Sequence, residues 1–261
     1  MKFFSIITIC KDNIDELKKT YRSVVNQSVT DYEWIVIDGN SHDGTREWLT
    51  EINFSNWISE PDKGIYDAMN KGITMAKGRY LIFMNSGDSF ASNEVLEKIK
   101  NIIQDNNFPG FIYGDSIDIS ENGREFYRKA KNHNKNWMGM ITQHQAMFIK
   151  NESVVKKQYS LNYKLSGDYA YISEILSELK EDDILRISFP ICKFSMGGAN
   201  EEHRFKAIKE DYLIRKKIIN LSFFTNLTLF SLHFLHAFIK KTTPSVRFIR
   251  HKTVVKNVLF F

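Results

Sequence analysis

A short polar sequence directly after an apolar run is the first place where this chain could do chemistry. The run Tyr80 to Met84 is followed by Asn85, Ser86, Gly87 and Asp88. A carboxylate and an amide oxygen are ligands that a hard divalent cation takes, and such a cation can grip a diphosphate. These residue types are also common in plain turns. The sequence therefore predicts either a cation and diphosphate site or an ordinary turn here.

Another carboxylate, Asp38, also stands at the end of an apolar run, Tyr32 to Ile37. A side chain at that place can accept a hydrogen bond from a nucleobase imide or a ribose hydroxyl. Asp43 comes just before the next helical pattern, so we expect it to cap that helix. The two aspartates are thus assigned different roles.

Asp168 and His144 are the remaining candidates for chemistry. Asp168 opens a helical pattern, where an acid is favoured by the helix dipole even without a functional role. Its carboxylate could also serve as a general base. His144 precedes the apolar run Ala146 to Ile149. It could donate to a diphosphate, ligate a metal, or fasten the backbone of its own loop.

The elements that must position these groups alternate between strand and helix patterns. Phe3 to Cys10 and Tyr32 to Ile37 predict buried strands, and Arg46 to Ile52 predicts a helix. Between the two strands, Leu17, Tyr21, Val24 and Val25 are expected to face the sheet from a helix that Asp12 or Asn13 caps. This order is typical of a right-handed parallel βαβ sheet.

The helix before Gly78 shows two rows of residues that favour close packing. One row is small (Ala68, Gly72, Ala76) and the other is apolar (Ile65, Met69, Ile73). The strand that follows, Tyr80 to Met84, is apolar on both faces, as in a buried parallel sheet. Polar side chains at its carboxyl end stand where open α/β sheets bind ligands.

The second half of the chain is less regular. Asn93 to Asn106 predicts an amphipathic helix, and Phe111 to Tyr113 predicts a strand that ends near Asp115. Segments 116–120 and 124–128 flank a hairpin turn, and 129–140 reads as a mobile loop over the site. Asp115 is a second carboxylate candidate at a strand end.

Length and composition bound the protein class. A chain of 261 residues suits one large α/β domain, or one domain with an appendage. Cys10 and Cys192 are far apart and lack metal-ligand spacing, so we expect buried thiols in a reducing compartment. The N-terminus lacks the pattern of a signal peptide, and no GxGxxG or P-loop sequence is present. We therefore expect a cytoplasmic protein without a dinucleotide cofactor.

The C-terminal segment carries an unusual charge balance. From Leu213 to Phe261 there are nine Lys or Arg and no Asp or Glu. Residues 218–239 are rich in Leu and Phe but contain two Asn and two His, and basic residues flank them. This pattern favours a helix lying in an anionic membrane interface over a helix that spans the bilayer. The alternative is a helix packed on the catalytic domain or on a second copy of the chain.

Several of these blocks together resemble one enzyme family. The first strand with its polar turn, the sequence IDGNSHDGT, the block EPDKGIYDAMNKG and the strand ending in NSGD are similar to inverting family 2 glycosyltransferases of the GT-A type. The resemblance is dense over residues 3–90 and thinner to about residue 200. It is strongest to the branch that makes bacterial colanic-acid-like exopolysaccharides, capsules and the O-antigens of lipopolysaccharide.

The resemblance implies a nucleotide-diphosphate sugar donor, a saccharide acceptor and a divalent cation, Mg²⁺ or Mn²⁺. It implies that Asp168 is the catalytic base and that Asp88 and Asn85 hold the metal, although Asn85 replaces the usual first aspartate of the metal motif. The implied donor-binding residues are Thr8, Asp12, Asp38, Asp62, Lys63, Asp67, Asn70, Asn85, His144 and Gln145.

The expected fold is a Rossmann-like GT-A sheet, mostly parallel and flanked by helices, with a C-terminal helical extension that associates with membrane. We expect a glycosyltransferase domain at 1–212, with its donor half at 1–90 and acceptor half at 91–212, and an extension at 213–261. The expected acceptor is linked to polyprenyl diphosphate at the inner face of the cell membrane. A second copy of the chain is a further candidate partner, and nucleic acid is not expected. The alternative function is an inactive nucleotide-sugar-binding module held on membrane by its basic segment.

Overall fold

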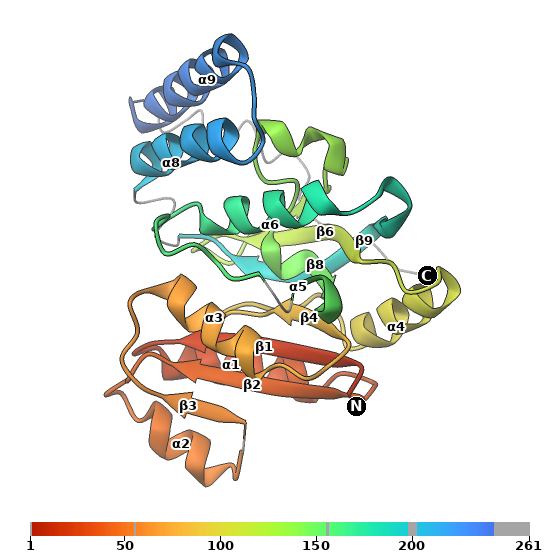
Figure 1. Ribbon diagram of the computed structural model, residues 1–261. Coiled ribbons are helices and arrows are strands. Elements are labelled where there is room, and N and C mark those ends of the chain that lie inside the picture. Colours follow the sequence, from red (N-terminus) through yellow and green to blue (C-terminus); the bar gives the residue numbers. More distant parts are fainter. Residues whose placement is uncertain (1, 55, 155–156, 198–202, 243–261) are drawn as a thin grey trace.

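The structure is a computed structural model, and it describes residues 2–54, 56–154, 157–197 and 203–242 (Figure 1). Its first half contains β1 (Phe4–Cys10), α1 (Ile14–Val25), β2 (Tyr32–Asp38), α2 (Thr45–Glu51), β3 (Trp57–Ser59), α3 (Ile65–Met75), β4 (Tyr80–Phe83), β5 (Ser89–Phe90) and α4 (Val95–Asp105). The second half contains β6 (Phe111–Ile119), β7 (Glu125–Arg128), β8 (Met147–Lys150), α5 (Asn151–Val154), α6 (Gly167–Glu178), β9 (Ile184–Ser195), α8 (Arg204–Lys217) and α9 (Phe223–Thr242). Three 3₁₀ turns add η1 (His133–Met138), η2 (His144–Ala146) and η3 (Glu181–Asp183).

The described strands form one sheet in the order β3-β2-β1-β4-β8-β6-β9-β5, with β7 beside β6. Strands β3, β2, β1 and β4 are parallel, as the sequence predicts. Beyond β4 the sheet is mixed, because β8 runs antiparallel to both β4 and β6 while β6 and β9 are parallel. The sheet is therefore parallel from β3 to β4, as expected, and combines parallel and antiparallel pairs beyond β4.

Helices cover both faces of this sheet and create two apolar cores. One core packs side chains of α1, α2 and α4 against the sheet, including Leu17, Leu49 and Ile99. The other packs α3 and α6 on the opposite face, including Met69 and Ile172. Strands buried on both faces explain why β1 and β4 read as continuous apolar runs.

Close packing of α3 on the sheet depends on its small residues. A Cβ atom on Gly72 would lie 2.4 Å from the Ile7 side chain, so this position tolerates no side chain. Ala68, Met69 and Ile73 are buried as predicted. Ile65 is exposed, which corrects its predicted inward direction, because it lies in the first turn where α3 emerges from the sheet edge.

Two predictions for α1 were wrong. Val25, the last residue of the helix, is 45% exposed. Neither Asp12 nor Asn13 caps α1 through its side chain; instead the Asp43 carboxylate accepts from the Ile14 N–H at 2.7 Å. Asp43 also accepts from the Thr45 N–H at 3.2 Å, as predicted for α2. One aspartate thus serves the first turns of two helices.

The acceptor half contains longer strands than the sequence pattern indicates. β6 continues through Gly114 and Asp115 with shifts of register against β9, so the predicted strand end is an irregularity inside one strand. The predicted hairpin is confirmed, since β6 pairs with β7 antiparallel. Part of the predicted mobile loop is η1, whose Asn136 side chain is buried and donates to Ser173 Oγ at 2.9 Å.

The C-terminal helices α8 and α9 pack together at one end of the molecule, next to α6 (Figure 1). The predicted boundary between residues 212 and 213 falls inside α8, so the extension continues directly from this helix. Residues 243–261 of the predicted extension lie outside the described residues. Across the described residues, no helix combines the length and apolar character that crossing a bilayer requires.

Candidate active site

The carboxyl ends of β1, β2 and β4 bring three predicted polar groups to one edge of the sheet. Asp12 follows β1, Asp38 is the last residue of β2, and Asn85 to Asp88 follow β4. Strand order reverses at β1, since β2 lies on one side of it and β4 on the other. Such a switch point is where open α/β sheets bind ligands.

Asp88 is almost fully buried beneath this edge, with 4% of its surface exposed. Its Oδ2 accepts from Gln145 Nε2 at 2.6 Å, and its Oδ1 accepts from the Ser195 backbone N–H at 3.0 Å. Burial raises the pKa of Asp88 to about 6, although these hydrogen bonds and nearby His144 act in the opposite direction. A cation beside this carboxylate would offset the cost of its burial.

The loop that carries Asp88 has two further oxygens that are buried without a partner in the described part of the chain, besides Oε1 of Gln145. They are Asn85 Oδ1 and Ser86 Oγ. An ion that keeps several waters and takes phosphate oxygens needs few protein ligands, so the Asp88 carboxylate with Asn85 Oδ1 fits Mg²⁺ or Mn²⁺. Among the described residues, no three His, Cys, Asp or Glu side chains gather into a metal-binding group. The protein without a donor is therefore expected to bind the divalent cation weakly.

His144 joins the Asn85 loop to Asp168. Its Nδ1 lies 3.2 Å from Asp168 Oδ2, and its Nε2 lies 3.1 Å from Asn85 Nδ2. An N–H at Nδ1 donates to the aspartate, while an unprotonated Nε2 accepts from the Asn85 amide and leaves Asn85 Oδ1 free. Burial lowers the pKa of His144, but the carboxylates of Asp168 and Asp88 outweigh it and raise the pKa above its usual value.

Asp168 stands in the first turn of α6, and one of its carboxylate oxygens is buried and unpaired. Its side chain is 16% exposed, and Oδ1 has no hydrogen-bond partner within the described residues. The preceding Gly167 leaves room for Tyr66, because a Cβ there would lie 2.6 Å from the Tyr66 ring. Burial raises the pKa of Tyr66, and Asp168 adds to this effect. The carboxylate thus lies beside His144, and its charge acts on the Tyr66 hydroxyl.

Glu210, on α8, holds the loop that leads to Asp168. Its carboxylate accepts from the backbone N–H groups of Lys164, Leu165 and Ser166 at 2.9, 2.9 and 2.8 Å. Three successive bonds to one carboxylate fix the entry to α6. Neither Glu210 nor Ser195 could be recognised from the sequence, because their partners lie 44 and 107 residues away.

Asp38 and Thr8 are fully buried, and protein groups occupy their side chains. Asp38 accepts from the Ser41 N–H at 3.0 Å, from the Ser41 hydroxyl, and from Ser59 Oγ at 2.5 Å. Thr8 Oγ1 donates to the Met84 carbonyl at 2.7 Å and accepts from Trp34 Nε1 at 2.9 Å. Both side chains hold the loops at this edge, and their roles in donor binding stay predictions.

Asp12 and Asn70 are also engaged within the protein. The Asp12 carboxylate accepts from the His42 N–H at 2.8 Å. The Asn70 amide exchanges two hydrogen bonds with the Tyr159 backbone, at 2.7 and 2.9 Å. Asn70 therefore ties α3 to the acceptor half, and the structure shows no free polar atom on it that points to a donor.

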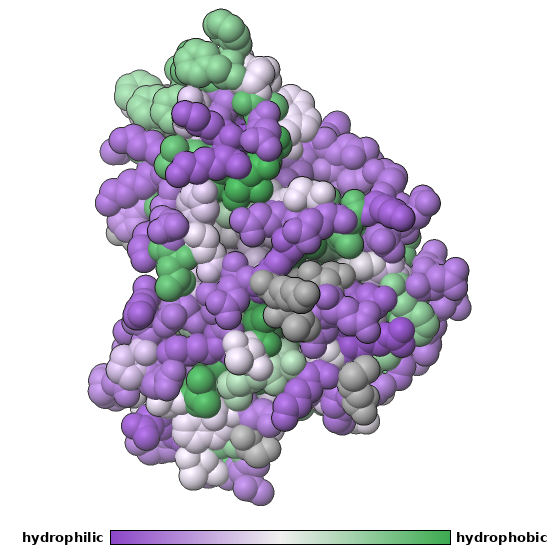
Figure 2. Space-filling model, viewed as in Figure 1, coloured by the Kyte–Doolittle hydropathy of each residue, from purple (hydrophilic) through white to green (hydrophobic). Residues whose placement is uncertain are grey.

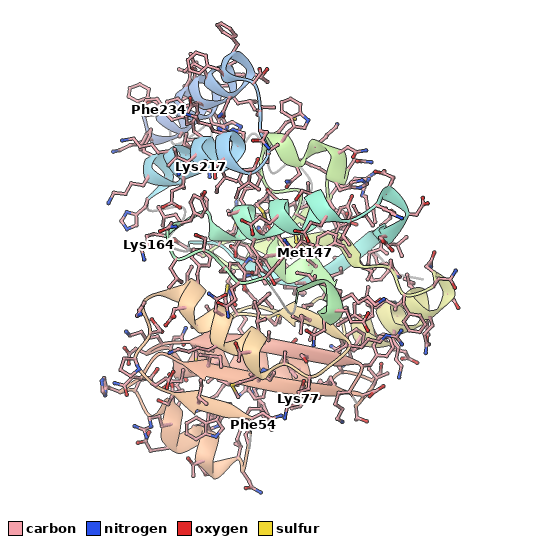
Figure 3. All side chains as sticks on the ribbon, in the orientation of Figure 1. Phe54, Lys77, Met147, Lys164, Lys217 and Phe234 are labelled. Atoms are coloured by element: carbon pink, nitrogen blue, oxygen red, sulfur yellow. The ribbon has the colours of Figure 1, made fainter. Side chains whose placement is uncertain are left out.

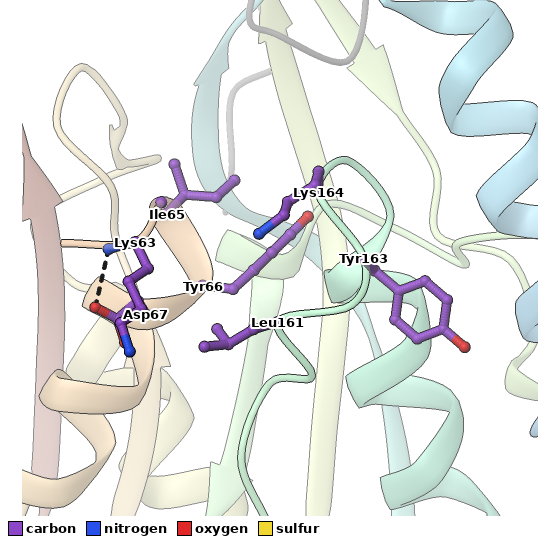
Figure 4. A pocket seen from close by; sticks show the side chains of 8 residues that line it. Lys63, Ile65, Tyr66, Asp67, Leu161, Tyr163 and Lys164 are labelled. Atoms are coloured by element: carbon purple, nitrogen blue, oxygen red, sulfur yellow. Dashed lines mark hydrogen bonds between the residues drawn. The ribbon is translucent and has the colours of Figure 1, made fainter.

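The start of α3 lines an open depression of about 210 Å³ (Figure 4). Asp62 and Asp67 order this turn by accepting from the N–H groups of Gly64 at 2.9 Å and Lys63 at 3.1 Å. Lys164, from the loop before α6, lies across the depression near Tyr66 (Figure 4). Donor-half and acceptor-half side chains therefore meet here, beside the first turn of α6.

Asp115, the alternative carboxylate, is committed to the fold. It is buried, and it accepts from the Tyr127 hydroxyl and from the Ala130 N–H at 2.7 Å. Asp168 is the predicted base with an oxygen left to accept a proton. The arrangement suits general-base attack by a hydroxyl beside a bound anionic leaving group.

Comparison with known proteins agrees with this geometry. The model of the family described as "Glycosyl transferase family 2" matches residues 5–163. The chain belongs to glycosyl transferase family 2. An uncharacterized glycosyltransferase of Mycobacterium tuberculosis is 29% identical over 222 residues, covering 79% of this chain and 80% of the relative. A PGL/p-HBAD biosynthesis glycosyltransferase of Mycobacterium bovis is 31% identical, over 46% of this chain and 49% of that one.

Solved structures share the fold of this family 2 glycosyltransferase. S. aureus TarS 1-349 in complex with UDP covers 98% of this chain and 76% of its own, with a TM-score of 0.64 and 14% identity. The mannosyltransferase PcManGT of Pyrobaculum calidifontis, in complex with GDP-Man and Mn²⁺, covers 95% and 78%, with a TM-score of 0.58 and 12% identity. The family assignment confirms the resemblance and makes the chain a glycosyltransferase.

Proposed function

We propose that this glycosyltransferase moves a sugar from a nucleotide-diphosphate sugar to a hydroxyl of a saccharide acceptor, with inversion at the anomeric carbon. The observation that carries the proposal is the connection between the Asn85 loop and Asp168 through His144. It puts a carboxylate with an unpartnered oxygen next to the loop where the diphosphate is expected.

Inversion requires the acceptor hydroxyl to attack from the face opposite the nucleotide. The acceptor oxygen forms the new bond to the anomeric carbon, its proton passes to Asp168 Oδ1, and the bond to the diphosphate oxygen breaks with its electron pair. A positioned carboxylate base is typically worth about 10²–10⁴-fold in rate. No covalent bond between sugar and protein is needed.

The diphosphate end of the donor is assigned to Asn85 and Gln145, and the nucleoside end to the edge of β1 and β2. His144 is assigned to positioning, because its ring spans Asn85 and Asp168. The complexes of TarS with UDP and of PcManGT with GDP-Man support a nucleotide-sugar donor. For the remaining donor contacts we retain the predicted residues Thr8, Asp12, Asp38, Asp62, Lys63, Asp67 and Asn70.

Asp88 and Asn85 Oδ1 are assigned to a divalent cation, Mg²⁺ or Mn²⁺. When bound, such a cation neutralises the charge that develops on the departing diphosphate. Mn²⁺ accompanies GDP-Man in PcManGT, which supports this assignment. With an amide instead of a first carboxylate, the site depends on the donor's phosphates to complete its ligands.

The acceptor is assigned to the glycans of the bacterial cell surface, built on polyprenyl diphosphate at the inner face of the cell membrane. The PGL/p-HBAD relative and a putative teichuronic acid biosynthesis glycosyltransferase of Bacillus subtilis support this class. The depression where Tyr66 and Lys164 meet lies beside the first turn of α6, which carries Asp168. The exposed Lys164 side chain at this depression suits a phosphate of the acceptor.

A thermal-shift panel tests the donor assignment. UDP-, GDP- and dTDP-sugars are each measured with Mg²⁺, with Mn²⁺ and with EDTA, because a bound ligand raises the unfolding temperature by mass action. Sugar nucleotides with one of the nucleobases should raise the unfolding temperature more than the others, and EDTA should reduce that rise. Equal responses to every nucleotide, or no response to any of them, would contradict the proposed donor site.

A further inference from the structure

The outer face of α9 is an exposed apolar surface that the active site does not use. Its Phe223 and Phe224 are 61% and 79% exposed. The other exposed apolar residues on this helix are Leu227, Leu232, Phe234, Leu235, Phe238 and Ile239. In Figure 2 these side chains form the apolar end of the molecule. Exposed apolar patches of this kind mark sites of interaction with a protein or a membrane.

The inner face of α9 is fixed on α8, so the outer face has a defined direction. Arg215 of α8 is fully buried and donates through Nε to Asn226 Oδ1 at 2.8 Å. Asn226 Nδ2 donates in turn to the Tyr212 carbonyl at 3.0 Å. Tyr212 of α8 and Phe230 of α9 add a ring contact with centroids 5.7 Å apart. Because α9 already packs on α8 through its other face, the exposed residues point away from the domain.

Charge identifies the occupant of the outer face. Exposed Lys216 and Lys217 end α8, Lys241 stands in the last turn of α9, and no Asp or Glu occurs from Leu213 onward. Phe234 and Lys217 come from these two adjacent helices (Figure 3). A second copy of the chain would bring the same positive charges to the contact, which opposes pairing. An anionic lipid surface provides both opposite charge and an apolar interior.

We propose that the outer face of α9 docks onto an anionic lipid bilayer. The helix lies along the surface with its Phe and Leu side chains among the acyl chains and with the basic residues among the headgroups.

Docking of this kind also orients the enzyme. α9 lies beyond α8, α8 lies next to α6, and β3 and α2 lie at the opposite end of the molecule (Figure 1). The acceptor half that carries Asp168 then faces the bilayer, and the donor half faces the aqueous side. Membrane docking itself does not depend on the identity of the donor or the acceptor.

Vesicle sedimentation of the full chain tests the docking. Wild type should sediment with vesicles of phosphatidylcholine and phosphatidylglycerol, much less with phosphatidylcholine alone, and less at high salt because surface charge is screened. A Phe224→Ser, Leu235→Ser, Phe238→Ser variant should lose at least about tenfold in vesicle affinity, since each exposed side chain removed takes apolar area from the lipid. Its nucleotide-induced thermal shift should match wild type, which shows that it is folded.

Site-specific fluorescence provides an independent readout. Both native cysteines are buried, so one introduced cysteine can be labelled selectively with an environment-sensitive dye. A dye on Phe224→Cys should shift to the blue with anionic vesicles, whereas a dye on Val25→Cys, which is 45% exposed on α1 in the donor half, should not. Equal shifts at both positions, or none at position 224, would overturn the proposal. So would a wild-type dimer that the triple variant dissociates without any vesicle binding.

Discussion

His144 Nδ1 lies 3.2 Å from Asp168 Oδ2, and this contact connects the two halves of the site. The other ring nitrogen lies 3.1 Å from the Asn85 amide, in the loop after β4. One imidazole thus spans the distance between the predicted diphosphate loop and the predicted base. Its position determines the direction in which the Asp168 carboxylate points.

Replacing His144 separates a positioning role from donor binding. His144→Gln removes the ring that spans Asn85 and Asp168, so transfer should slow by about 10–100-fold because the base is misplaced. Donor affinity should stay within about threefold, since the loss affects the transition state alone. Steady-state rates and nucleotide titrations measure the two effects. The control is His133→Gln, which removes the contact between the His133 ring and the exposed Glu181 carboxylate.

A different outcome would reassign His144. If donor affinity weakened as much as the rate fell, the imidazole would contact the diphosphate directly in the working complex.

Glu210 should affect catalysis although it belongs to α8. Glu210→Ala leaves three backbone N–H groups of the loop before Asp168 without their acceptor, so the loop loses its fixed position. We expect a fall in kcat of about 10-fold or more with little change in donor affinity. Glu210→Gln, which retains one acceptor oxygen, should be intermediate.

The control for Glu210→Gln is Glu47→Gln, at an exposed position of α2. A Glu210→Ala enzyme with the wild-type kcat would mean that the loop before α6 keeps its position without the carboxylate.

Asp88 should make nucleotide binding depend on a divalent cation. Asp88→Asn keeps the size of the side chain and an acceptor for the Ser195 N–H, but it removes the charge that attracts the ion. Nucleotide binding should become weak and insensitive to EDTA. Titrating UDP or GDP with and without Mn²⁺ measures this. Wild-type affinity and wild-type EDTA sensitivity in the variant would move the cation to other ligands.

The fold of the donor half could be predicted from the sequence because its strands and helices follow a regular apolar pattern. β1, β2 and β4 are continuous apolar runs, and their polar ends meet at one edge by the geometry of a parallel sheet. The strands beyond β4, where the sheet is mixed, were harder to predict. β6 carries Gly114 and Asp115 inside a strand, and only the Tyr127 and Ala130 partners explain why Asp115 turns inward.

Contacts between distant segments could not be predicted in the same way. Asp38 was expected to bind a nucleoside, but the sequence could not show that Ser41 and Ser59 bond to its carboxylate. Likewise, a glutamate in a charged helix gives no sign that it holds the loop at residues 164–166. Pairings of this kind depend on tertiary contacts between segments far apart in the chain.

His233 should make a destabilising contribution in mild acid. Burial and the positive charges of Arg215, Arg204, Lys131 and His236 lower the pKa of His233 from 6.5 to about 4. Below about pH 6.5 the unfolded chain binds a proton at this position that the folded protein does not, so the contribution of His233 to the free energy of unfolding decreases as the pH falls toward 4. Asp88, whose pKa is raised to about 6, contributes in the opposite direction over this range. Denaturant unfolding at several pH values measures this slope.

His233→Gln should make that slope shallower, while His42→Gln, at an exposed loop position, should leave it unchanged. An unchanged slope in His233→Gln would place the acid sensitivity elsewhere.

The direct test of the account is the rate at which Asp168→Asn releases nucleoside diphosphate from the donor. The same base serves a sugar hydroxyl or a water molecule, so the test does not require a known acceptor. Asparagine keeps the size of the side chain but cannot take the proton, so the rate should fall by at least about 100-fold. Donor affinity should stay normal, and the free energy of unfolding should change by no more than about 1 kcal/mol. Release at the wild-type rate by a folded variant that binds donor would show that Asp168 is not the base.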